Sequence, residues 1–95
     1  MDLKPQSPGQ VREVLRALAG QKPANAAELA HIQRASLLLA LHIQGSPSLG
    51  SSMPEIAWHF LSDADIRYKS PEYQDVQTST LLSALGEWES EESLG

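Results

Sequence analysis

The segment between Asn25 and Gly45 most limits the folds that this chain can adopt. Asn25 is a favourable N-cap with Glu28 three residues later, and Gly45 ends the helical pattern. The segment therefore predicts a helix over residues 26–44, about 28 Å long. At about 100° per residue, its apolar side chains fall into two stripes on well-separated sides of the helix. One stripe contains Leu29, Ile32, Leu39 and Ile43, and the other contains Ala30, Leu37 and Leu41.

A helix that is apolar on two sides has two structural interpretations. It is typical of a central helix that packs between neighbours, and this is the arrangement we predict for residues 26–44. Alternatively, one stripe packs into the core and the other binds a second chain. A short chain has few other helices to cover both stripes, so this alternative stays open.

One helix is predicted before this segment and one after it. Ser7 caps the first, which begins at Pro8 and ends at Gly20. After a Ser- and Gly-rich segment over residues 45–52, which predicts a mobile loop, another helix begins at residue 53 or 54 and ends at residue 61. Ser52 is the predicted cap of that helix.

The last predicted helix begins at Pro71, after Ser70 as its cap, and extends to Trp88. Residues 63–69 predict either one more helical turn or a short extended piece. The fold class is therefore all-α: a small single-domain bundle of about four helices, with the apolar helix over 26–44 at its centre.

The length of 95 residues is sufficient for one domain. We expect a disordered N-terminus over residues 1–7 and a single helical domain over residues 8–88. Residues 89–95 are acidic and predict a disordered tail.

The composition excludes several classes of protein. The chain has no cysteine, which excludes disulfide scaffolds and thiolate metal sites and fits a reducing compartment. Its longest apolar run, residues 37–41, is far shorter than the ~20 residues of a membrane span, and the N-terminus lacks the apolar region of a secretory signal. We therefore predict a soluble cytoplasmic protein with no membrane partner.

Charge is distributed unevenly along the chain, whose net charge is −5. Residues 1–50 contain five basic and three acidic side chains, whereas residues 51–95 contain two basic and nine acidic ones. The acidic half would repel phosphate, so nucleic-acid binding is disfavoured, and it would suit a basic protein surface.

The three histidines raise the question of a metal site. Glu28 and His31 match the Glu-x-x-His step of carboxylate-bridged di-iron bundles, but such bundles need two of these steps. His31 and His42 share a helix side yet lie about 16 Å apart along its axis, too far to share one ion. Glu55 and His59 form a second pair on one helix face. We predict no metal site from these residues, and a metal-binding helical protein is the weakest of the alternatives.

Catalytic signatures are absent from the sequence. It contains no Gly-x-Ser-x-Gly nucleophile elbow and no Gly-rich phosphate loop with its lysine. We therefore predict that the protein is not an enzyme, has no catalytic residue and binds no cofactor.

A small DNA-binding regulator is the main alternative. Residues 54–61 would be the recognition helix of a winged helix and residues 66–78 its hairpin. That helix, however, carries no Lys or Arg to meet phosphate or guanine. A further alternative is an inhibitor whose acidic half mimics DNA.

The function we predict is that of a non-catalytic accessory or regulatory protein that acts through protein–protein interaction, with a homodimer as its simplest form. Its partner would present a basic or an apolar surface. The predicted partner-binding residues come from the second stripe, the two tryptophans and the acidic C-terminal region: Leu37, Leu41, Trp58, Trp88, Glu87 and Glu89.

Overall fold

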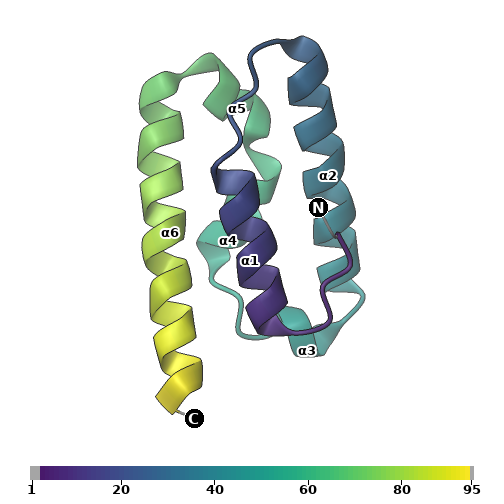
Figure 1. The fold of residues 1–95 in the computed structure, drawn as a ribbon, viewed down its shortest axis with the longest axis vertical. Helices are drawn as coiled ribbons and strands as arrows, with labels where there is room; N and C mark the ends of the chain where they lie inside the picture. Colours follow the sequence, from purple (N-terminus) through teal and green to yellow (C-terminus); the bar gives the residue numbers. More distant parts are fainter. Residues whose placement is uncertain (1–2, 95) are drawn as a thin grey trace.

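Helices form all the regular secondary structure of residues 3–94, the part of the chain that the computed structural model describes (Figure 1). The all-α fold is therefore confirmed. Its helices are α1 (Pro8–Ala19), α2 (Ala26–Gln44), α3 (Pro47–Gly50), α4 (Glu55–Ser62), α5 (Ala64–Lys69) and α6 (Pro71–Leu94).

Side-chain caps fix the starts of the three longest helices where the sequence predicted them. The Ser7 hydroxyl accepts the backbone N–H of Gln10 at 3.2 Å at the start of α1. The Asn25 side chain accepts the N–H of Glu28 at 2.9 Å at the start of α2. The Ser70 hydroxyl accepts from the third residue of α6 at 3.2 Å. Each cap satisfies a backbone donor that the first helical turn leaves without a partner.

The segment over residues 45–52 is more ordered than the sequence indicated. It contains the single turn of α3, whose Leu49 is buried in the core. Ser52 does not cap α4, which starts without a side-chain cap. Its hydroxyl instead accepts the indole N–H of Trp88 at 3.1 Å, so a distant tryptophan takes the group that the sequence assigned to a local cap.

The two chain ends are also better anchored than predicted. Near the N-terminus, Pro5 is buried, and its carbonyl oxygen accepts the ring N–H of His42 at 2.8 Å. Residues 89–94, predicted to be a disordered tail, continue α6. Ion pairs to α1 explain why these residues are helical. Arg12 lies 2.9 Å from Glu92, and Arg16 lies 3.1 Å from Glu89, one turn earlier in α6. Residues 1, 2 and 95, which also belonged to the predicted disordered ends, lie outside the described residues.

The core lies between α1, α2, α4 and α6. In Figure 1, α6 and α2 form the two sides of the molecule, with α1 in front of α4 between them. α2 packs against α3, α4 and α5, whereas α1 packs against α3 and α6. The largest fully buried side chains include Trp88, Phe60, Leu15, Leu39, Ile43, Leu81 and Leu85. α2 therefore stands at one side of the bundle rather than at the centre that we predicted for it.

A polar network around the buried Arg67 and Gln77 joins α5 to α4 and α6. Arg67 donates to the carbonyl oxygen of Phe60 at 2.5 Å and to the Gln77 side chain at 2.7 Å. Gln77 in turn donates to the carboxylate of Asp63 at 2.9 Å, which also accepts from the Tyr73 hydroxyl at 2.8 Å. Burial lowers the pKa of Arg67, and the nearby Asp63 carboxylate opposes that effect. Of residues 63–69, which the sequence left ambiguous, residues 64–69 are thus held as a helix by tertiary contacts.

Candidate protein-interaction groove

The two apolar stripes of α2 have different environments. Ile32, Leu39 and Ile43 of the first stripe are buried in the core. Leu37 and Leu41 of the second stripe are 58% and 54% exposed. The structure therefore corresponds to the alternative in which one stripe packs inside and the other faces away from the core.

The exposed stripe forms one wall of a groove of about 610 Å³ between α2, α4 and the start of α5. We call this the α2–α4 groove. The residues that line it are Gln33, Leu37, Ala40, Leu41 and Gln44 from α2, Trp58, Leu61 and Ser62 from α4, and Ala64 from α5. Because 33, 37, 40, 41 and 44 recur at helical spacing, they lie on one side of α2 and face the same space.

Trp58 forms part of the opposite wall. The ring is half-buried, and a Cβ atom added at Gly50 would lie 3.5 Å from its Cζ2 atom. The indole therefore lies beside α3 at a distance that an ordinary side chain would also allow. One side of the ring packs against the protein, while the residue still lines the groove with Leu37 and Leu41.

The chemistry of the groove is neutral. None of the described residues that line it carries an ionisable side chain. Its polar groups are the amides of Gln33 and Gln44 and the hydroxyl of Ser62, which donates to the Trp58 carbonyl oxygen at 3.1 Å. Such a surface can bury apolar side chains and exchange amide hydrogen bonds.

Trp88 does not belong to this surface, which corrects its predicted role as a partner-binding residue. Its side chain is 2% exposed, its N–H is bound by Ser52, and the Arg12 guanidinium lies 4.9 Å from the ring centroid. The periodicity of α6 places it on the same side as Leu81 and Leu85, and that side faces the core.

The acidic residues near the C-terminus do not border the groove either. Glu87 and Glu89 are exposed on α6, at the side of the molecule away from α2 (Figure 1). Glu89 pairs with Arg16 at 3.1 Å. The structure thus brings together Leu37, Leu41 and Trp58 of the predicted surface, and it places the other predicted residues elsewhere.

Several groove residues were absent from the predicted site. Gln33, Ala40 and Gln44 follow the spacing of the second stripe, so the sequence contained the signal that could have identified them. Leu61 and Ala64 line the groove because α4 and α5 pack against α2, and no local pattern reports that packing.

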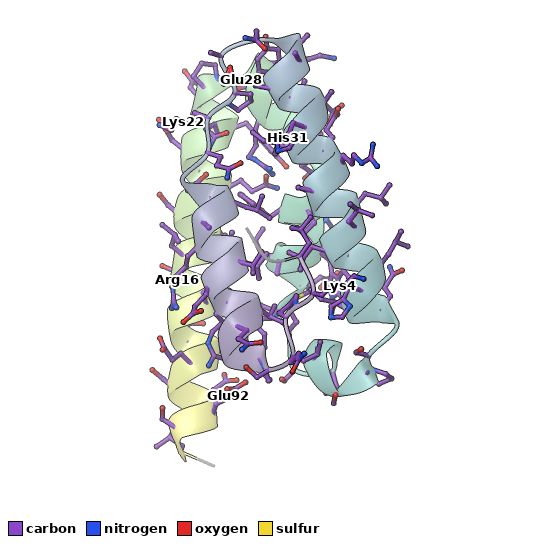
Figure 2. The ribbon with its side chains drawn as sticks, turned by 45° about the vertical axis from the view of Figure 1, so that its right-hand side comes forward. Lys4, Arg16, Lys22, Glu28, His31 and Glu92 are labelled. Carbon is purple, nitrogen blue, oxygen red and sulfur yellow. The ribbon has the colours of Figure 1, made fainter. Side chains whose placement is uncertain are left out.

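The histidines do not converge. Glu28 and His31 line a separate hollow beside the linker between α1 and α2, together with Lys22 (Figure 2). His42 faces the carbonyl oxygen of Pro5, and His59 lies 3.7 Å from Glu55 on α4. Within residues 3–94, no three His, Asp or Glu side chains are grouped as a metal site would require.

The winged-helix alternative lacks its wing in the described part of the chain. Residues 66–78, which would form its hairpin, belong to α5 and α6 instead. Also within the described residues, no helix combines the length and hydrophobicity that a membrane-spanning segment requires.

Comparison of the chain with protein-family models, curated proteins and solved structures gives no match.

Proposed function

We propose that this protein is a non-catalytic accessory or regulatory protein that acts by binding an apolar protein surface in the α2–α4 groove. The observation that carries the proposal is the position of Leu37 and Leu41, each more than half exposed, opposite the half-buried Trp58. A leucine that becomes fully buried contributes about 1.5–3 kcal/mol relative to an exposed one, so an exposed pair favours association. Aromatic residues at the edge of a pocket are frequent energetic centres of protein interfaces.

The neutral lining supports an apolar partner rather than a basic one. The exposed glutamates that would attract a basic surface lie on α6, and Glu89 and Glu92 already pair with Arg16 and Arg12. The partner that fits the groove is therefore a helix or loop that presents leucine-like side chains between uncharged polar groups.

The same lining supports a role without catalysis. Among the described lining residues, the hydroxyl group belongs to Ser62, and it donates a hydrogen bond to the backbone carbonyl oxygen of Trp58. No histidine, carboxylate or amine lines the described groove to activate that hydroxyl as a nucleophile. A cytoplasmic site of action is part of the proposal and rests on the cysteine-free composition.

Site-specific photo-cross-linking in the cells that make the protein tests the proposal. A photoreactive amino acid at Gln44, at the rim of the groove, should form adducts with protein. The substitution Leu41→Glu should remove these adducts, because association would bury a carboxylate without a partner. Val76→Glu is the matched control, since Val76 is 66% exposed on α6 and lies outside the groove.

Circular dichroism and urea unfolding must accompany these variants. We expect Leu41→Glu to remain folded, with a free energy of unfolding within about 1 kcal/mol of the unsubstituted chain, because the leucine is largely exposed. Absence of any adduct from Gln44, or loss of adducts equally in Val76→Glu, would contradict the proposed function.

A further inference from the structure

The side chains of α2 that line the groove are arranged symmetrically about the middle of their stripe. In chain order they are an amide, a leucine, an alanine, a leucine and an amide: Gln33, Leu37, Ala40, Leu41 and Gln44. The midpoint between Gln33 and Gln44 nearly coincides with the midpoint between Leu37 and Leu41, close to residue 39. Reversing the direction of the helix therefore leaves the chemical pattern almost unchanged.

This symmetry matters for a two-fold dimer with antiparallel helices. In such an interface, if one residue contacts a second, the second contacts the first across the axis. An axis near residue 39 would place Leu37 against Leu41 of the second copy and Gln33 against Gln44. A parallel pairing places each residue against itself and needs no such symmetry, and its aligned helix dipoles are unfavourable.

Each of these pairs is chemically compatible. Leucine against leucine buries two side chains that are more than half exposed in one chain. A glutamine amide donates and accepts, so two amides can pair reciprocally. Ala40 would lie nearest to the axis, where its small side chain allows the two helices to approach closely.

Charge at the groove does not oppose a second copy. Each chain has a net charge of −5, so two copies repel one another over most directions of approach. The described lining of the α2–α4 groove has no ionisable group, and α6, the helix that contains Glu87 and Glu89, lies on the other side of the molecule from α2. Contact through this groove therefore brings no like charges together inside the interface.

The area of a stable interface requires more than the α2 stripe. Specific interfaces bury about 800 Å² per partner, which is about one-seventh of the 5658 Å² that the described chain exposes. Two single helices that cross cover less than this. The opposite wall, with Trp58 and Leu61, must therefore take part, and Trp58→Ala should weaken the dimer.

We propose that the occupant of the α2–α4 groove is a second copy of this chain, with the two α2 helices antiparallel about an axis near residue 39. The inference rests on the proposed function, because it names the protein that fills the same groove.

Light scattering of the purified full chain across a hundredfold range of concentration is the first test. We expect the mass to rise from one chain to two, and Leu41→Glu to lower the association constant at least about 100-fold, since each substitution enters the interface twice. Val76→Glu should leave the association unchanged. Higher salt should preserve the dimer or strengthen it, because salt screens the repulsion between the two acidic chains.

Single introduced cysteines then test the relative direction of the two α2 helices. Because the sequence contains no cysteine, any cross-link must come from the introduced thiol. Ala40→Cys should cross-link to itself through a short thiol-reactive linker. Gln33→Cys should not, because its two copies would lie about 17 Å apart along the axes, at 1.5 Å per residue. A mixture of Gln33→Cys and Gln44→Cys chains should cross-link to one another.

The outcomes separate this inference from the proposed function. A chain that stays monomeric at every concentration, or Gln33→Cys that links to itself as in a parallel pair, would overturn the antiparallel dimer. If Gln44 still formed adducts with a different protein in cells, the proposed function would stand while the dimer failed. If neither self-association nor adducts appeared, both would fail.

Discussion

The guanidinium of Arg67 lies 3.7 Å from the centroid of the Phe60 ring and donates a hydrogen bond to the carbonyl oxygen of the same residue. The two contacts tie α5 to α4 where α4 approaches its C-terminus. Because Arg67 also binds Gln77, a single buried side chain holds three helices together. The α2–α4 groove depends on this arrangement, since α4 and α5 form the wall opposite Leu37.

Arg67→Met should lower the free energy of unfolding by about 2–4 kcal/mol, because the Gln77 amide oxygen loses this donor and the Phe60 carbonyl keeps only the weaker bond from the Asp63 N–H at 3.4 Å. Urea unfolding measures the change. Lys69→Met, exposed on the same helix, should change the stability by no more than about 0.5 kcal/mol. A double variant that also carries Gln77→Leu should lose less than the sum of the two single losses, since it removes both polar partners. An Arg67→Met protein as stable as the unsubstituted chain would show that the network is not needed.

The hydrogen bond that the Tyr73 hydroxyl donates to Asp63 predicts a loss of stability at high pH. This bond raises the pKa of the hydroxyl above its ordinary value of 10.0, and burial adds to the effect. The unfolded chain therefore loses the phenol proton first as the pH rises. The stabilisation is fully present below pH 10.0 and is lost as the pH rises through the pKa of the folded protein. Between a pH below that range and a pH above it, the urea midpoint of Tyr73→Phe should decrease less than that of the unsubstituted chain. The midpoint of Tyr68→Phe should decrease as much as that of the unsubstituted chain. Equal slopes in all three proteins would contradict the role given to Tyr73.

The glycines at positions 86 and 50 predict opposite outcomes for substitution by alanine. A Cβ at Gly86 would meet no atom within 4 Å, so Gly86→Ala should stabilise α6 by about 0.5–1 kcal/mol. A Cβ at Gly50 would lie 3.0 Å from Cγ2 of Ile43, so Gly50→Ala should gain nothing or lose stability. Thermal unfolding of both variants measures the difference. If Gly50→Ala stabilised the protein more than Gly86→Ala, α3 would pack less closely against α2 than the structure shows.

The two tryptophans predict different fluorescence behaviour. Trp88→Phe leaves Trp58 as the reporter, and its emission should shift to shorter wavelength as association removes water from the groove. Trp58→Phe leaves Trp88, whose burial should make its emission independent of protein concentration. Trp88→Phe should also cost about 1–3 kcal/mol of stability, through the space that it leaves and the lost bond to Ser52. A concentration-dependent shift from Trp88 alone would contradict the placement of the interface.

Local interactions made part of the fold predictable. The starts of α1, α2 and α6 depend on side chains within a few residues, such as Ser7, Asn25 and Ser70, so the sequence identifies them directly. The helical period also separated the two stripes of α2. It could not decide which stripe is buried, because that choice depends on where α4 and α5 pack.

The incorrect predictions share a cause in contacts that are distant along the chain. Ser52 appeared to be a helix cap but binds Trp88, and residues 89–94 appeared to be a tail but reach Arg12 and Arg16. Trp88 appeared to be an interface anchor because its partners lie far away in the sequence. The structure therefore brings together the predicted residues of α2 and α4 in one groove, whereas it places those of α6 elsewhere.

The pairing of α1 with α6 sets an order of events during synthesis. Among the helices of residues 3–94, α1 is synthesised first, and α6, against which it packs, is synthesised last. Until Glu89 and Glu92 have been added, Arg12 and Arg16 lack their ion-pair partners, and until α6 has formed, the apolar side of α1 lacks part of the surface that covers it. The nascent chain therefore cannot complete its bundle before α6 has been synthesised. A chain that lacks even the last two turns of α6 should expose α1 and become a substrate for chaperones and proteases.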